Sequence, residues 1–196
     1  MEDLILVRKN NWMNKLKFFS ESLKNLRTVG TFTRSSKFAC EKMVSYVDFD
    51  KSKVIVELGA GDGVITKHIV ENMRDDAILL TFEVNEEFCK TIRKEIDDPR
   101  VKVIEDTAEK LPYYLEQYGC KEVDNIVSAI PFVSIPEKIG RKIINISKGT
   151  LKQGGRFIQI YYSLLVKSRY EEIFNNVEVH FEPRNMPPAF VLECWD

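Results

Sequence analysis

The sequence has little histidine and cysteine and no long hydrophobic run. With two histidines among 196 residues, no metal site is expected. The four cysteines form no C-x-x-C pair, which indicates free thiols in a reducing compartment. No segment approaches the roughly 18 apolar residues that span a bilayer, and the N-terminus lacks the apolar core of a signal peptide. These absences argue against a membrane-spanning or disulfide-stabilised protein.

The composition is that of an ordinary globular protein whose charge is unevenly distributed. Hydrophobic residues make up 44% of the chain and charged residues 30%, with a net charge of −1. The length suits one domain with a core large enough to fold unaided. Residues 8–34, however, carry seven basic residues and one acidic residue, so the remaining chain is acidic. A basic arm on an acidic body indicates a surface or a partner for that arm.

Residues 9–27 have the pattern of an amphipathic helix. Five large apolar residues recur at helical spacing: Trp12, Leu16, Phe19, Leu23 and Leu26. The lysines fall mostly off this stripe, a pattern typical of a helix that lies on anionic lipid. The alternative is a helix that packs on its own domain and leaves its lysines in solvent.

A glycine-rich loop follows the most clearly predicted strand. Residues 54–58 form a short apolar, β-branched run that indicates a buried parallel strand. Glu57 lies near its end, and Gly59, Gly61 and Gly63 alternate directly after it. Since glycine has no Cβ, backbone N–H groups of such a loop can approach a ligand closely. The acid suits a ligand that carries an amine better than a pyrophosphate, and the alternative is a turn that binds nothing.

The rest of the chain alternates strands with helices. Further strands are expected over residues 77–83, 101–104, 123–128, 156–162, 177–181 and 189–194. Helices are expected over residues 37–47, 64–70, 86–96 and 139–151, and one that includes residues 170–174. The turn at residues 152–155 is expected to end the fourth of these helices. The pattern predicts an α/β three-layer sandwich whose sheet is mostly parallel and has an antiparallel C-terminal strand.

Two further acidic residues follow predicted strands. Glu83 lies 20 residues after Gly63, where nucleotide-binding α/β folds place a carboxylate on ribose hydroxyls. Asp106 follows the third strand. The simpler interpretation of Asp106 is an N-cap of the next helix, with Glu109 as its capping-box partner.

The loop with its acid, E-x-G-x-G-x-G, resembles the signature of class I S-adenosylmethionine-dependent methyltransferases. The resemblance implies a Rossmann-like fold, S-adenosylmethionine as cofactor and S-adenosylhomocysteine as product. It implies that Glu57 and the three glycines hold the methionine end, Glu83 the ribose, and Asp106 with Thr107 the adenine. The backbone at Ser128 and Ala129 would then flank the sulfonium.

The loop after the fourth strand indicates which acceptor is methylated. Enzymes that methylate adenine in ribosomal RNA carry N-L-P-Y or N-I-P-F here, whereas this chain has Ala129-Ile130-Pro131-Phe132. Alanine cannot accept a hydrogen bond from the base amine. The acidic body also argues against a nucleic-acid partner.

The whole chain is similar to the small bacterial phospholipid N-methyltransferases. The similarity rests on the basic N-terminus leading into Val29-Gly30 and Ser35-Ser36, on the glycine loop, and on three later stretches: Ser128-Ala129-Ile130-Pro131, Gly154-Gly155-Arg156-Phe157-Ile158-Gln159 and Asn185-Met186-Pro187-Pro188-Ala189. The family usually has leucine in place of Ile130 and Met186.

This resemblance implies methylation of phosphatidylethanolamine toward phosphatidylcholine by a cytoplasmic enzyme that is peripheral on the inner face of the cell membrane. Residues 9–27 would contact the anionic membrane surface. Residues 1–36 would form the segment that covers the cofactor, and residues 37–196 the methyltransferase domain. The open alternatives are another aminolipid such as an ornithine lipid, ribosomal RNA adenine, and a cofactor-binding protein without catalysis.

Residues for the acceptor are predicted from their positions in this family-like arrangement. Tyr161 or Tyr162, at the end of the fifth strand, and Ser128 would lie near the acceptor, and Arg34 or Arg184 would bind a lipid phosphate. The alternatives are a core tyrosine and solvent-exposed arginines. No side chain is an evident general base, so water or the lipid phosphate would take the proton.

Overall fold

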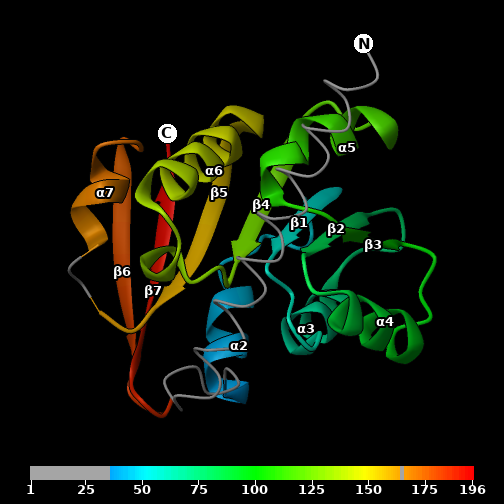
Figure 1. Ribbon diagram of the computed structural model, residues 1–196, viewed down its shortest axis with the longest axis horizontal. Coiled ribbons are helices and arrows are strands. Elements are labelled where there is room, and N and C mark those ends of the chain that lie inside the picture. The colour runs from blue at the N-terminus through cyan, green and yellow to red at the C-terminus, as the bar shows by residue number, and fades with distance from the viewer. Residues whose placement is uncertain (1–35, 164–165) are drawn as a thin grey trace, which may run out of the picture. The chain divides into compact units, whose positions relative to one another are not determined.

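The computed structural model describes residues 36–163 and 166–196 (Figure 1). The predicted amphipathic helix over residues 9–27, and Arg34, lie outside these residues. The strands are β1 (Val54–Leu58), β2 (Ile78–Glu83), β3 (Val101–Glu105), β4 (Val123–Ser128), β5 (Leu151–Tyr161), β6 (Asn176–Glu182) and β7 (Ala189–Trp195). The helices are α2 (Lys37–Val44), α3 (Val64–Asn72), α4 (Glu86–Glu95), α5 (Leu111–Gln117), α6 (Glu137–Thr150) and α7 (Lys167–Glu171), with 3₁₀ turns η1 (Ala108–Lys110) and η2 (Phe132–Ser134).

The described strands form one seven-stranded sheet of order β3-β2-β1-β4-β5-β7-β6. The five strands β1 to β5 are parallel, and β7 runs antiparallel to both of its neighbours. The chain leaves β1 toward β2 on one side and later adds β4 on the other side. The carboxyl ends of β1 and β4 therefore flank the point where the strand order reverses, which is where open α/β sheets bind ligands. The predicted fold class is confirmed.

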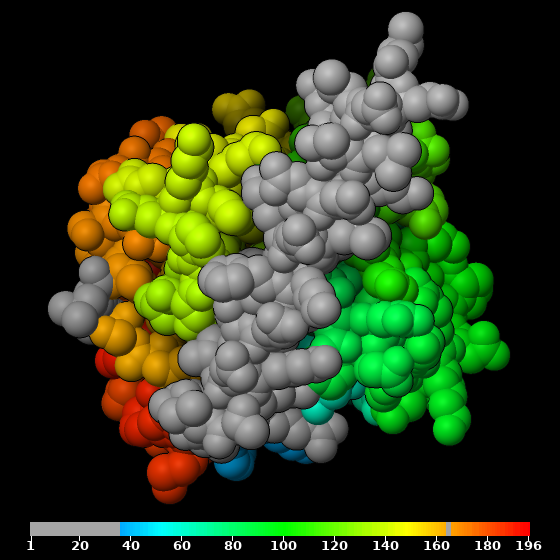
Figure 2. Space-filling view, viewed as in Figure 1, coloured from blue at the N-terminus to red at the C-terminus, as the bar shows by residue number. Residues whose placement is uncertain are grey.

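Helices cover both faces of the sheet, because right-handed crossovers that progress in opposite directions place their helices on opposite faces. On one face, α2 contacts α3 and β5, and Gly63 at the start of α3 lies against Ile92 of α4. On the other face, α5 contacts α6. Arg141 of α6 forms an ion pair of 2.8 Å with Glu172, just after α7. In the space-filling view, α7 and β6, in orange, lie beside α6, in yellow-green (Figure 2).

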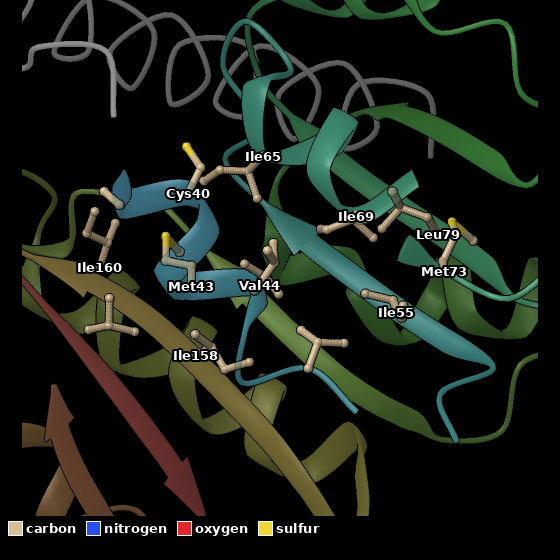
Figure 3. Packing of buried hydrophobic residues seen from close by; sticks show 14 of the residues in the cluster. Cys40, Met43, Val44, Ile55, Ile65, Ile69, Met73, Leu79, Ile158 and Ile160 are labelled. Carbon is tan, nitrogen blue, oxygen red and sulfur yellow. The ribbon is translucent and has the colours of Figure 1, made fainter. Parts of the chain in front are cut away.

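The main hydrophobic core lies between the sheet and the α2–α3 face. Figure 3 shows side chains of α2 and α3 packed over those of β1 and β5. The spacing of the buried residues Ala39, Cys40, Met43 and Val44 gives α2 a single apolar face. Three of the four cysteines of the chain, Cys40, Cys89 and Cys194, are buried, and all four are free thiols as predicted.

One predicted turn is wrong. Residues 152–155 belong to β5, which pairs with β4 from Leu151 onward. The register shifts between Leu151 and Arg156, so the extra residues form a bulge opposite the start of β4. Gly154 has φ +74° there. Gly154 and Gly155 thus permit the bulge. Helix α6 ends at Thr150, because the chain becomes extended at Leu151.

Candidate functional site

The glycine loop between β1 and α3 is folded onto the end of β2. The N–H groups of Gly59 and Ala60 both donate to the Phe82 carbonyl, at 2.9 and 3.2 Å. The next N–H, of Gly61, donates to the Glu83 carboxylate at 2.8 Å. The loop is therefore fixed by its own backbone donors at the edge of the sheet where β1 and β4 end.

Two of the three glycines in this loop meet a steric limit as well as a conformational one. Gly59 has φ +77°, and an added Cβ would lie 3.1 Å from the Ile130 side chain and 3.2 Å from its backbone nitrogen. Gly63 has φ +81°, and its Cβ would lie 3.0 Å from Ile92. A side chain at Gly59 would thus separate the glycine loop from the loop after β4.

Glu57 is a buried carboxylate with one satisfied oxygen. Its Oε2 accepts hydrogen bonds from Thr66 at 2.7 Å and Thr81 at 3.2 Å. Its Oε1 is buried and has no hydrogen-bond partner among the described residues. Burial raises the pKa of Glu57 to about 7, and the two threonine hydrogen bonds oppose this shift. An unsatisfied buried carboxylate oxygen at a glycine loop fits the ammonium group of a methionine moiety.

Glu83 is fixed at the end of β2 by the backbone on both sides of it. Its Oε2 accepts from Gly61, and its Oε1 accepts from the N–H of Asn85 at 2.9 Å. Each carboxylate oxygen has two lone pairs. The same carboxylate that holds the glycine loop can therefore also receive hydroxyl donors from a ribose.

Asp106 lies at the end of β3 and is held by partners that sequence analysis missed. Its Oδ2 accepts from Lys110 at 2.9 Å and from Tyr114 at 3.0 Å. Burial, followed by the hydrogen bond to Asp106, raises the pKa of Tyr114 to about 12. Lys110 and Tyr114 follow Asp106 by four and eight residues, in η1 and α5, and this spacing is the signal that could have identified both partners.

The alternative interpretation of Asp106 as a helix N-cap is wrong. Thr107 is the N-cap of η1, and its side chain accepts from the N–H of Glu109 at 3.4 Å. Asp106 instead accepts from the N–H of Thr107 at 2.6 Å. The carboxylate thus lies directly after Glu105, which is the register partner of Glu83.

The loop after β4 closes against the glycine loop. Ala129 donates its N–H to the Leu58 carbonyl at 2.9 Å, and the N–H of Ile130 points to Ser128 Oγ at 3.4 Å. Ser128 is fully buried. All the predicted cofactor residues thus lie at the carboxyl ends of four adjacent parallel strands, β3, β2, β1 and β4, and their individual roles stay predictions.

The residues predicted for the acceptor lie farther along the sheet. The Tyr161 hydroxyl is 2.6 Å from the Tyr170 hydroxyl, and Tyr161 is buried. Burial raises the pKa of Tyr161 to about 12 and that of Tyr170 further. Tyr162 is half-buried and packs against the main core.

Arg184 lies in the turn between β6 and β7 and is already engaged by a carboxylate. Its Nε and Nη2 donate to the two carboxylate oxygens of Glu182 at 2.8 and 2.9 Å, and its guanidinium lies 4.4 Å from the centre of the Phe38 ring. The side chain is still 59% exposed. A lipid phosphate at Arg184 would therefore share the guanidinium with Glu182.

A separate group of ligand-type side chains lies on β6 and β7. Atoms of Glu178, His180 and Glu193 come within 4.8 Å of one another. Glu193 also forms an ion pair with Arg156, so one of the two carboxylates already has a cationic partner. The prediction that the chain binds no metal is not tested by this arrangement.

Comparison with known proteins gives a family and a related enzyme. The family model "Methyltransferase small domain" matches residues 22–185. A curated relative, the ornithine lipid N-methyltransferase of Singulisphaera acidiphila, is 30% identical over 179 residues, which are 90% of this chain and 93% of the relative.

Solved structures with the same fold include two methyltransferases. Precorrin-6y C5,15-methyltransferase from Geobacter metallireducens has a TM-score of 0.64 at 15% identity and covers 84% of this chain and 94% of its own. Magnesium protoporphyrin IX methyltransferase from Synechocystis, solved with bound S-adenosylmethionine, has a TM-score of 0.64 at 9% identity and covers 91% and 93%.

Substitution of Gly59 by alanine tests the contact between the two loops. We expect Gly59→Ala to lower the free energy of unfolding by about 2–3 kcal/mol, because the positive φ adds about 1–2 kcal/mol of strain and Ile130 must also move. Gly119→Ala is the matched control, because Gly119 has φ +68° and open space around its Cβ. Thermal unfolding would measure the loss of stability, and calorimetric titration with S-adenosylhomocysteine would measure binding to the glycine loop. Equal losses in the two variants would contradict the contact.

Substitution of Glu57 by glutamine tests the buried carboxylate. Because the folded pKa of about 7 lies above the ordinary value of 4.5, the stability contribution of Glu57 is complete below pH 4.5 and is lost as pH rises through 7. The loss in the ligand-free protein should reach about 3 kcal/mol. Urea unfolding between pH 4 and 8 should show a stability difference between Glu57→Gln and wild type that changes across this window. A difference independent of pH would be inconsistent with the raised pKa.

Proposed function

We propose that this chain, which belongs to the methyltransferase small domain family and is an S-adenosylmethionine-dependent N-methyltransferase, methylates the amine of a membrane aminolipid. The observation that carries the substrate class is the similarity, over 90% of the chain, to an enzyme that methylates ornithine lipid. The similarity to phospholipid N-methyltransferases in the stretches 128–131 and 185–189 supports the same class.

The site fits the cofactor. When bound, S-adenosylmethionine supplies a methyl group on a positively charged sulfonium. Glu57 Oε1 would receive the ammonium of the methionine moiety, Glu83 the ribose hydroxyls and Asp106 the adenine amine. The loop at residues 59–63 leaves room for close approach of the ligand, because Gly59, Gly61 and Gly63 all have positive φ.

The loop after β4 supports a lipid amine over a nucleic-acid base. Ala129 offers no side-chain acceptor at the position where adenine methyltransferases have asparagine. A base would therefore lose a hydrogen bond that its binding depends on. Ribosomal RNA adenine remains the second candidate and receives its own arm in the assay below.

Two headgroups follow from the two similarities. The curated relative supports an ornithine lipid, and the motif similarity supports phosphatidylethanolamine. Phosphatidylethanolamine would place its phosphate near Arg184, whose Nε and Nη2 donors are already engaged by Glu182. An ornithine lipid has no phosphate to place there, so this engagement favours the ornithine lipid.

The proton of the acceptor amine leaves without a strong side-chain base. Because burial raises the pKa values of Tyr161 and Tyr170, both hydroxyls stay protonated at neutral pH. The two hydroxyls would line the predicted acceptor site as neutral groups, and water would take the proton from the amine.

The enzyme would work at a membrane surface, with the carboxyl edge of its sheet toward the lipid. None of the helices in the described ranges is long and apolar enough to cross a bilayer. At the carboxyl edge, Met186 is 81% exposed in the β6–β7 turn, Val133 is 64% exposed in η2, and Phe38 is 40% exposed at the start of α2. The turn forms the red projection at the foot of Figure 2. We propose that these side chains and residues 9–27 bind the inner face of the cell membrane.

The β6–β7 turn is tied to the start of α2. Asn185 accepts from the N–H of Ser36 at 3.0 Å and donates to the Pro187 carbonyl at 2.6 Å. Asn185 is itself buried. The backbone next to the exposed Met186 is therefore fixed by hydrogen bonds. Met186 could contact the membrane without a rearrangement of the turn.

Methyl transfer from labelled S-adenosylmethionine tests the function. The acceptors are anionic liposomes with phosphatidylethanolamine, liposomes with ornithine lipid, and unmodified ribosomal RNA. Label in either lipid is expected, because the acceptor is an aminolipid, and the arm that carries it identifies the headgroup. Label in RNA alone would overturn the proposal, and Glu57→Gln should abolish labelling in every arm.

A surface variant tests the membrane contact separately. Val133→Ser combined with Met186→Ser should lower vesicle binding and activity on vesicles about tenfold, because both apolar side chains lose their burial in lipid. Activity on a short-chain, water-soluble aminolipid should not change. Tyr118→Ser is the matched control, because Tyr118 is 41% exposed and follows α5 at the opposite edge of the sheet. Unchanged vesicle binding in the double variant would exclude this edge as the contact.

A further inference from the structure

Gln159 is a fully buried amide at the carboxyl edge of the sheet. It lies in β5, two residues before the end of the strand, and it is paired with Ser128 of β4 and Leu192 of β7. Register partners on neighbouring strands project from the same face. The side chains of Gln159 and Ser128, both fully buried, therefore lie next to each other beneath the loop that follows β4.

The orientation of the Gln159 amide is fixed by two carbonyl groups. Its Nε2 donates to the Ile130 carbonyl at 3.1 Å and to the Ile160 carbonyl at 2.8 Å. The reverse orientation would place Oε1 against two acceptors, so the assignment of nitrogen and oxygen is unambiguous. Oε1 is consequently the atom that faces away from both carbonyls.

Gln159 also links the loop after β4 to the cofactor loop. Ile130, whose carbonyl it binds, is the residue that an added Cβ at Gly59 would touch. The amide thus fixes Ile130 from one side, and Gly59 limits it from the other. This contact chain sets the position of the predicted acceptor loop against the predicted cofactor loop.

The Oε1 of Gln159 is buried and has no hydrogen-bond partner among the described residues. A buried acceptor without a donor is unfavourable, and a leucine or methionine would fill the same space without that cost. Ala129, one residue before Ile130, has no acceptor to offer an amine. The strand thus carries an unused acceptor beside a loop that lacks one.

We propose that Gln159 determines specificity for the amine: its Nε2 positions the loop, and its Oε1 accepts an N–H from the acceptor nitrogen. This proposal rests on the proposed function, in which the acceptor is an aminolipid. The nitrogen attacks as the neutral amine, its lone pair forms the N–C bond while the C–S electron pair goes to sulfur, and one proton leaves to water. The hydrogen bond to Oε1 directs the lone pair toward the methyl group.

The number of N–H groups on the acceptor makes the proposal testable. A neutral primary amine has two N–H groups, a monomethylated amine has one, and a dimethylated amine has none. Only the first two can donate to Oε1 when they attack. A defect in positioning alone would affect all three acceptors by the same factor.

The experiment compares kcat/KM between wild type and Gln159→Met. The three acceptors are the unmethylated, monomethylated and dimethylated forms of the aminolipid that takes up label in the assay above. Gln159→Met should lose roughly 30-fold with the unmethylated and monomethylated lipids, and about threefold with the dimethylated lipid, because only the first two lose a hydrogen bond. Ser147→Ala is the matched control. Ser147 Oγ is also buried without a partner among the described residues, but it lies in the last turn of α6. Its three values should stay within twofold of wild type.

A second variant separates the two roles of the amide. Gln159→Glu keeps the side-chain length and an acceptor oxygen but removes the Nε2 donor to Ile130 and Ile160, so it should lose activity on all three lipids by factors that differ less than threefold. A uniform loss with Gln159→Met, or a loss largest for the dimethylated lipid, would overturn the role of Gln159 while leaving the proposed function intact. A wild-type protein that methylates none of the three lipids would instead overturn the proposed function.

Discussion

The burial of the Glu57 carboxylate at the end of β1 is the constraint on which the surrounding structure depends. A carboxylate in the middle of a parallel sheet must be supported by neighbouring donors, and Thr66 of α3 and Thr81 of β2 provide them for one oxygen. Thr81 is the register partner of Glu57, so this support requires the correct alignment of β1 and β2. The other oxygen is available to a ligand, and the glycine loop directly follows it. The predicted cofactor site is therefore part of the packing of the central strands.

A second carboxylate extends this arrangement to the neighbouring strand. Glu83 holds the Gly61 N–H, so the glycine loop is fixed by the strand next to the one it follows. Ile130, after β4, approaches the same loop from the other side. Gly59 and Ile130, which are 71 positions apart in sequence, thus restrict each other through direct van der Waals contact. Parallel topology makes this possible, because all the strands concerned end at one edge.

Much of the fold, and the placement of the candidate cofactor residues at one edge of the sheet, could be predicted from the sequence, because both depend on local signals. Alternating glycines after an apolar run predict a strand, a loop with positive φ and a helix, and each was found. The partners of Asp106 and the pairing of Tyr161 with Tyr170 were missed, because they depend on how elements pack. Gln159 was noticed only as part of a motif, since its bonds to Ile130 and Ile160 depend on strand register. Gly154 and Gly155 were misassigned because a bulge and a turn need the same residue type.

The tie between Asn185 and Ser36 has a mechanical consequence. The β6–β7 turn and the first residue before α2 are one rigid point, since a buried side chain joins them. The N-terminal segment of the chain enters the domain at this point. A force applied at Ser36 is thus divided between the backbone of α2, which packs against β5, and the turn that carries Met186.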